Sequence, residues 1–281
     1  MKTILLPTDF SKNSINAINY AVELYKNEVC NFYILNVQRA SSFISDDMLV
    51  VNASATIYNT IVDAAKKSIN NIIAKIVKKH SNGNHHFEAV VDYDNFIDSI
   101  NQVSEKYNVD LIIMGTKGAS GLAKVLFGSN TIKVIQRGVA PVLAIPENCK
   151  YSGLDKVGFI TSFKTLYNIN DFKPLNDIIA LNNSEIHIMH ALCDQDATEE
   201  LNKCISRLKK NFNNPVFNYL VVKNDKVFET IHEFTETKGI KMIAMLVSKH
   251  TFLERLFKTH AVETIAFATV IPFLAMKKNE D

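Results

Sequence analysis

The sequence has no block of charge of a single sign. Its 31 Lys and Arg residues are interspersed with 29 Asp and Glu residues, and the formal net charge is +2. A nucleic-acid-binding surface normally shows as a cluster of basic residues. The densest basic runs, Lys78-Lys79-His80 and Lys277-Lys278, are interpreted as solvated helix or tail ends. We therefore expect no nucleic-acid partner.

Cysteine and long apolar runs are also scarce. The four cysteines form no Cys-x-x-Cys pair and have no histidine at a spacing suited to zinc, which argues against a disulfide framework or a structural metal site. The first apolar run, Ile4–Leu6, is too short for a signal peptide, and no later stretch approaches about 20 uninterrupted apolar residues. We expect a soluble, cytoplasmic protein without membrane contact.

Short apolar runs alternate with amphipathic segments along the first half of the chain. The expected strands are Ile4–Pro7, Phe32–Val37, Phe87–Val91, Val109–Met114 and Pro141–Ile145. The expected helices are Ser14–Tyr25, Ile57–Lys79, Phe96–Tyr107 and Thr131–Gln136. Strands that alternate with helices predict a parallel sheet covered on both faces.

The second half repeats this pattern. At an offset of 131 residues, Pro141–Ala144 aligns with Pro272–Ala275, and Val90-Val91 aligns with Val221-Val222. Near the start of each half the offset is 153 or 154, so the second copy lacks 23 residues after its second strand. We predict two tandem five-stranded parallel-sheet α/β domains, Rossmann-like, with residues 1–148 in the first and 149–281 in the second.

Each copy ends in a short apolar strand, Pro141–Ile145 and Pro272–Met276. Alone, each strand would be an exposed sheet edge. We therefore expect the two halves to pack against each other as an internal pseudo-dimer, with a further homodimer left open.

Glycines mark the segment after the fourth expected strand. Gly115-Thr116-Lys117-Gly118 is followed by nine residues and then by Gly128-Ser129. Backbone N–H groups are unpaired at a helix N-terminus, and glycine lets them approach an anion closely. Ser129 could add a hydroxyl group as a helix cap or as a phosphate donor. The pattern predicts a phosphate-binding loop, and the alternative is that the glycines only shape a tight turn.

This glycine pattern, together with Pro7-Thr8-Asp9 at the end of the first strand, resembles the universal stress protein family in a tandem form. The resemblance covers nearly the whole chain and implies an adenine nucleotide alpha hydrolase-like fold. It also implies an ATP site in the first half, with Mg²⁺ left open, in which Asp9 contacts adenosine and Val37 borders the adenine. The implied binding residues are Pro7, Thr8, Asp9, Val37, Met114, Gly115, Gly118, Gly128, Ser129, Asn130 and Thr131.

Two features depart from the family pattern. Asp92-Tyr93-Asp94-Asn95 follows the third strand, where family members often have a glycine-containing turn. The second copy has lost the loop, with Ser162, Leu246, Lys249, Thr259 and His260 at the positions of Asp9, Gly115, Gly118, Gly128 and Ser129. Side chains at the glycine positions should block close approach of a phosphate, so this copy is interpreted as structural.

We expect a nucleotide-dependent regulator of the stress-response type, with no catalytic and no metal-ligating residues assigned. The sequence contains neither Gly-x4-Gly-Lys-Ser/Thr nor Ser-Gly-Gly-x-Asp-Ser after the first strand, which nucleotide-hydrolysing and adenylating relatives need. Two alternatives remain open. One is a slow ATPase or phosphotransferase that uses Asp9 or Asp92 near a metal ion, and the other is a nucleotide-free interaction scaffold.

The segment Ser41–Thr56 has no clear periodicity and has no counterpart in the second copy. It leaves the sheet shortly after Val37, the expected neighbour of the adenine. Two interpretations are open: a lid that closes over the nucleotide or a partner, and a passive insertion that packs its own apolar residues.

Overall fold

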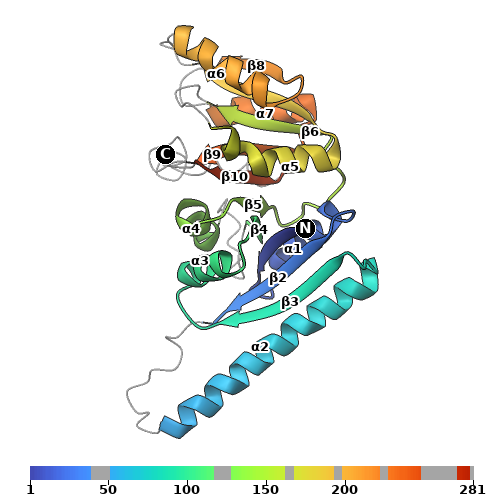
Figure 1. Cartoon of the computed structure of the whole chain (residues 1–281), viewed down its shortest axis with the longest axis vertical. Coiled ribbons are helices and arrows are strands. Elements are labelled where there is room, and N and C mark those ends of the chain that lie inside the picture. The colour runs from blue at the N-terminus through green and yellow to red at the C-terminus, as the bar shows by residue number, and fades with distance from the viewer. Residues whose placement is uncertain are drawn as a thin grey trace.

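The structure, a computed structural model, describes residues 1–38, 51–116, 128–161, 168–192, 198–221, 227–247 and 271–278. Ten strands form one sheet in the order β3-β2-β1-β4-β5-β10-β9-β6-β7-β8, with helices on both of its faces (Figure 1). The predicted α/β class, with five mostly parallel strands in each half, is confirmed.

The first half contains strands β1 to β5 and helices α1 to α4. In chain order these are β1 Lys2–Pro7, α1 Lys12–Leu24, β2 Cys30–Val37, α2 Val51–His80, β3 His85–Asp92, α3 Phe96–Lys106, β4 Leu111–Gly115, α4 Ser129–Arg137 and β5 Val142–Ile145. Strand β4 is buried along its whole length, as its apolar sequence predicts for a strand covered on both faces.

The second half contains strands β6 to β10, helices α5 to α7 and the short 3-10 helix η2. In chain order these are β6 Lys156–Thr161, η2 Ile169–Phe172, α5 Lys173–Asn182, β7 Glu185–Leu192, α6 Thr198–Asn211, β8 Val216–Val221, α7 Val227–Lys238, β9 Met242–Val247 and β10 Phe273–Lys277. The strand order of this half repeats that of the first. Strand β6 lies between β9 and β7, as β1 lies between β4 and β2.

The two halves join where their last strands meet. Strands β5 and β10 pair in the antiparallel direction, with Leu143 opposite Leu274, while the neighbouring pairs β4–β5 and β9–β10 are parallel. Hydrophobic residues of both halves also share each of the two core layers, one on each face of the sheet. The expected pairing of the two edge strands is thus present, and it buries both edges within one sheet.

The sheet register reproduces the internal repeat. Ile4 lies opposite Leu111, and Val157 lies opposite Met242, which correspond to the predicted offsets of 153 and 131. The prediction was wrong at the outer strand. Ala89 pairs with Ile34 and Phe217 pairs with Ile188, an offset of 128, so Val90 does not occupy the register of Val221.

The extra residues of the first copy lie partly in a helix. Helix α2 has 30 residues and begins at Val51, whereas its counterpart α6 has 14. Residues 51–56 were predicted to belong to an irregular excursion, and this part of the prediction was wrong because they are helical. The other residues of the proposed lid, 41–50, lie outside the described part of the chain.

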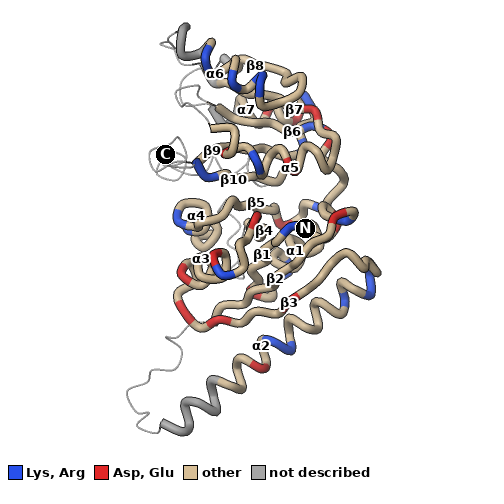
Figure 2. The backbone as a smooth tube through the Cα atoms, viewed as in Figure 1, with Lys and Arg blue, Asp and Glu red and all other residues tan. Residues whose placement is uncertain are grey.

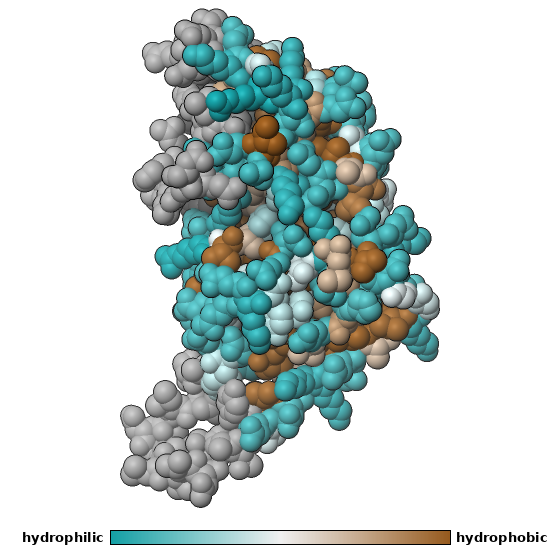
Figure 3. All heavy atoms as spheres, in the orientation of Figure 1, coloured by the Kyte–Doolittle hydropathy of each residue, from teal (hydrophilic) through white to brown (hydrophobic). Residues whose placement is uncertain are grey.

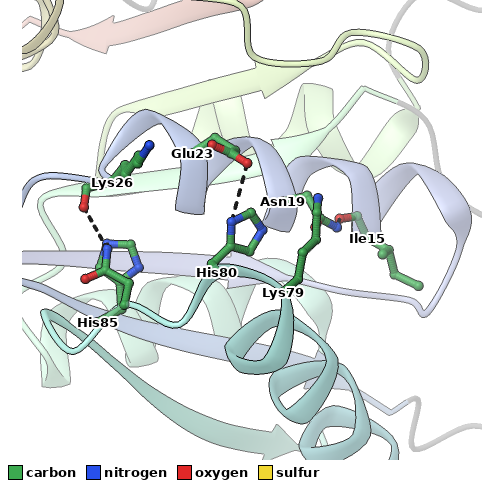
Figure 4. A network of polar contacts seen from close by, with 8 residues as sticks. Ile15, Asn19, Glu23, Lys26, Lys79, His80 and His85 are labelled. Atoms are coloured by element: carbon green, nitrogen blue, oxygen red, sulfur yellow. Dashed lines mark hydrogen bonds and ion pairs between the residues drawn. The ribbon is translucent and has the colours of Figure 1, made fainter.

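The C-terminal end of helix α2 is attached to α1 by polar contacts (Figure 4). His80 Nδ1 lies 3.4 Å from Glu23 Oε1, and Lys79 Nζ lies 3.5 Å from Asn19 Oδ1 on the same helix α1. Just beyond the helix, His85 at the start of β3 also joins the end of α1, since its Nε2 lies 2.9 Å from the carbonyl oxygen of Tyr25. These contacts fix one end of the long helix on the body of the first half.

Charged residues of both signs are spread over both halves (Figure 2). The face seen in Figure 3 is mainly hydrophilic, with hydrophobic residues in separate patches. Within the described ranges, no helix has both the length and the apolar character needed to cross a membrane.

Candidate functional site

Three strand ends meet at one edge of the first-half sheet. Strand β1 lies between β2 and β4, and all three run parallel. The chain moves outward from β1 to β2 and β3 and then returns to β4 on the other side of β1. Such a reversal of strand order leaves a crevice at the carboxyl ends, where ligands bind in open α/β sheets. Pro7, Val37 and Gly115 end these strands, so the structure brings the predicted segments together.

The turn after β1 is built by its own side chains. Thr8 Oγ1 accepts a hydrogen bond from the N–H of Phe10, and Asp9 Oδ1 accepts one from the N–H of Ser11. Phe10 has a φ of 63°, which costs a non-glycine residue about 1–3 kcal/mol. Ser11 then caps α1 by accepting from the N–H of Ser14. This turn leaves Asp9 exposed at the edge of the crevice while Thr8 is buried.

A buried asparagine connects the turn to the neighbouring strand. Asn36 Nδ2 donates to the carbonyl oxygen of Thr8 at 2.7 Å, and Asn36 Oδ1 accepts from Gln38 Nε2 at 2.6 Å. The side chain of Asn36 is 4% exposed. Because a buried carbonyl group without a partner costs about 1–3 kcal/mol, this bond helps to hold the end of β1 against β2.

Position 115 requires a glycine for a packing reason that the sequence did not reveal. A Cβ atom on Gly115 would lie 2.7 Å from Cγ of Asn13, a buried residue of α1. Gly115 therefore has a packing role, in addition to the expected role of letting the backbone approach a phosphate closely. The glycine lets the first turn of α1 pack closely against the end of β4.

Helix α4 begins beside the end of β4. The N–H of Gly128 donates to the carbonyl oxygen of Thr116 at 2.6 Å, and Thr131 Oγ1 donates to that of Gly115 at 3.0 Å. Gly128 occupies the N-cap position, and no side-chain hydrogen bond caps this end of α4. The first backbone N–H groups of a helix have no partner within the helix. Such groups attract anions, and the start of α4 lies beside the crevice.

One predicted role at this helix changes, and a second residue has a structural contact in addition to its predicted role. Ser129 is the first residue of α4 and not its cap, because Gly128 holds that position. The hydroxyl group of Thr131 is buried and donates to a strand carbonyl group, so its side chain holds α4 on β4. Ser129 and Asn130 are exposed at the start of the helix, and Met114 is buried in β4. Gly118 lies outside the described residues.

Sequence reasoning missed several polar residues of this region. Asn13, Ser14, Asn36 and Thr116 are all buried, and Ser14 Oγ lies 2.9 Å from Thr8 Oγ1. Ser11 stands just before an apolar helix, an N-cap signal that could have indicated the first turn of α1. Nothing in the local pattern marks Asn36 or Asn13, because their partners lie on other elements.

The two aspartates considered for a metal ion lie on different strands. Asp92 ends β3 opposite Val37 of β2, and Asp9 follows β1 on the other side of β2. Two strand spacings separate these backbones, about 10 Å. Among the residues that the structure describes, no group of three or more His, Cys, Asp and Glu side chains could hold a metal ion.

The second half keeps the frame of the site and changes its side chains. Thr161 ends β6 at the position of Thr8, and Leu246, which is buried, replaces Gly115. His190 replaces Asn36, and its Nδ1 lies 3.2 Å from the carbonyl oxygen of Thr161. The remaining counterparts, Ser162, Lys249, Thr259 and His260, lie outside the described residues.

The sequence comparisons with known proteins point to one family. A family model described as "Universal stress protein family" matches residues 1–146. A universal stress protein of Methanocaldococcus jannaschii is 28% identical over 144 residues, which are 51% of this chain and 81% of that protein. The universal stress protein A homolog 1 of Coxiella burnetii is 27% identical over 144 residues, 51% of this chain and 95% of that protein.

A solved structure extends the likeness to the second half. The crystal structure of a universal stress protein from Archaeoglobus fulgidus matches with a TM-score of 0.71 and 18% sequence identity. The match covers 99% of this chain and 98% of that one. At this identity the match shows the fold alone, and it includes both halves.

Proposed function

The chain belongs to the universal stress protein family, and on that premise we propose that it is a nucleotide-dependent stress-response regulator that binds one ATP in its first half. In this proposal, the exposed Asp9 accepts hydrogen bonds from the ribose hydroxyl groups, and Val37 borders the adenine. The phosphates lie at the N-terminus of α4 and against the loop that contains Gly118.

The N-terminus of α4 is the observation that carries the proposal. Its N-cap is a glycine without a side-chain cap, and Thr131 and Gly128 hold the helix at the end of β4. Phosphate groups are favoured at such a position by the free N–H groups and by the positive end of the helix dipole. In this proposal the nucleoside lies beside the phosphates, at the ends of β1 and β4, where ligands bind in open α/β sheets.

The ends of β1 and β2 support the position of the nucleoside. Asn36 holds Thr8, and the turn of Thr8, Phe10 and Ser11 orients Asp9 at the edge of the sheet. A site formed by fixed backbone needs little ordering when a ligand binds, which favours affinity. We propose no catalytic residue, and we assign no side chain to Mg²⁺.

The first test is mass spectrometry of the purified, denatured protein for retained nucleotide, followed by calorimetric titration with ATP. We expect binding of one ATP per chain, because Leu246 and the other replacements remove the glycines from the second copy. Two equivalent sites would contradict the assignment to the first half. Absence of binding would favour the nucleotide-free scaffold, and sustained phosphate release by contaminant-free protein would favour the slow ATPase.

A further inference from the structure

The helix at the proposed phosphate site is held at its other end by the second half of the chain. Lys277, the last residue of β10, donates from Nζ to the carbonyl oxygen of Ile135 at 2.6 Å. Ile135 lies in the last turn of α4, the helix whose N-terminus faces the crevice. The two residues are 142 positions apart, and the contact crosses the junction of β5 and β10.

We propose that Lys277 is a positioning residue for nucleotide binding, by which the second half acts on the phosphate site of the first half. This inference rests on the proposed function. A cation near the last carbonyl groups of a helix interacts favourably with the negative end of the helix dipole. Lys277 occupies that position, and it fixes the helix whose first N–H groups would hold the phosphates.

The surroundings of Lys277 strengthen the interaction. The residue is only partly exposed, and burial lowers the pKa of its ammonium group. A charge that is partly removed from water is screened less by salt and interacts more strongly with nearby dipoles. The effect of Lys277 on α4 should therefore persist at moderate ionic strength.

A neutral contact at the same helix end provides the natural comparison. Asn101 of α3 donates from Nδ2 to the carbonyl oxygen of Arg137 at 3.2 Å, and its Oδ1 accepts from the N–H of Val139. Asn101 and Lys277 both satisfy carbonyl groups of the last turn of α4. Only Lys277 brings a charge, so the two residues separate the effect of charge from that of a hydrogen bond.

The contact has no reciprocal partner in the sequence. At the offset of 131, the counterpart of Lys277 is Pro146, which has neither a charge nor an N–H group. Pro146 therefore cannot make the same contact from the first half. The contact is thus made by the half that lacks the glycine loop on the half that has it. This agrees with the expectation of a single nucleotide site in the first half.

The test is calorimetric titration of the full chain with ATP and with adenosine, for wild type and for Lys277→Met, Lys277→Arg and Asn101→Ala. We expect Lys277→Met to weaken ATP binding about two- to fivefold, the range for a charge at a helix end. Adenosine affinity should be unchanged because adenosine has no phosphate. Lys277→Arg should keep the wild-type affinity for ATP, and Asn101→Ala should change it less than Lys277→Met.

Each other outcome has a distinct meaning. If wild type does not bind ATP, the proposed function fails and this inference fails with it. If wild type binds ATP and Lys277→Met binds it equally well, the inference alone is overturned. An equal loss for ATP and adenosine would also overturn it, because general loosening of the fold would explain that result. Thermal unfolding of each variant checks that all are folded.

Discussion

The two halves use the same strand frame but differ at the carboxyl ends of their central strands. In the first half Asn36 donates to the carbonyl oxygen of Thr8, and in the second half His190 contacts that of Thr161 at the matching position. A polar link between the first two strands is thus kept, although its residue type has changed. The glycine that ends β4 has instead become the buried Leu246 in β9.

This comparison separates what the fold needs from what a ligand would need. The link between the strand ends serves the fold in both halves, because in each half it gives a buried carbonyl group a hydrogen-bond partner. The glycine loop is present only in the first half of the sequence, where the proposed site lies. The second half contributes instead through its edge strand, by pairing β10 with β5 and by placing Lys277 at α4.

The largest expected effect comes from a side chain at the start of α4. Gly128→Val should reduce ATP affinity by at least about 100-fold, because its bulk stands where backbone N–H groups must approach a phosphate. The matched control is Thr259→Val at the equivalent position of the second half, which should bind ATP as wild type does. Calorimetry measures both. If the two variants bound ATP with equal affinity, the phosphates would lie elsewhere, and the halves would not differ in function at this position.

The next effect concerns the link between the strand ends. Asn36→Ala should lower the free energy of unfolding by about 2 kcal/mol, because the buried carbonyl group of Thr8 loses its donor. His190→Ala should have a similar effect through Thr161. Urea unfolding followed by circular dichroism measures both losses. ATP affinity should fall only in Asn36→Ala, and a fall in His190→Ala would contradict the assignment of the site to the first half.

A smaller loss of stability is expected at the end of β4. Gly115→Ala should lower the free energy of unfolding by about 1 kcal/mol, because its Cβ would meet the buried side chain of Asn13 at 2.7 Å. The double variant with Asn13→Ala should lose less than the sum of the two single variants. Strict additivity in urea unfolding would show that the Asn13 contact is not the reason for glycine at this position.

The smallest effect is a pH dependence at the end of α2, the helix that is much longer than α6. Burial lowers the pKa of His80, although Glu23 beside it acts in the opposite direction. The folded protein therefore binds this proton less tightly than the unfolded chain does, and stability falls as the pH drops below about 6.5. His80→Gln should make this fall shallower in urea titrations between pH 7.5 and about 5.5.

The control for this measurement is His86→Gln, because His86 is exposed on the adjoining strand β3. It should leave the pH dependence of the unfolding free energy as in wild type. If His80→Gln leaves the pH dependence of the unfolding free energy unchanged, protonation of His80 does not affect the stability of the folded chain.

Much of the fold could be predicted because it depends on local periodicity. The strands and helices of the first half lie within a few residues of the predicted ranges, apart from the start of α2 at Val51. Apolar sequence at both final strands also predicted their pairing. The register of β8 was not predicted correctly, because it is set by the residues of β7 with which β8 pairs and not by the repeat alone.

The sequence by itself determined that this chain contains two copies of one α/β unit and that a glycine loop follows the fourth strand of the first copy only. Hydrophobic spacing and glycine positions are local properties, and a repeat makes them visible twice. The tertiary structure decided that Asn13 packs over Gly115, that Asn36 holds Thr8, and that Lys277 contacts α4 across the junction. These contacts join elements far apart in the chain, so their partners are set by how the helices and strands orient when the core packs.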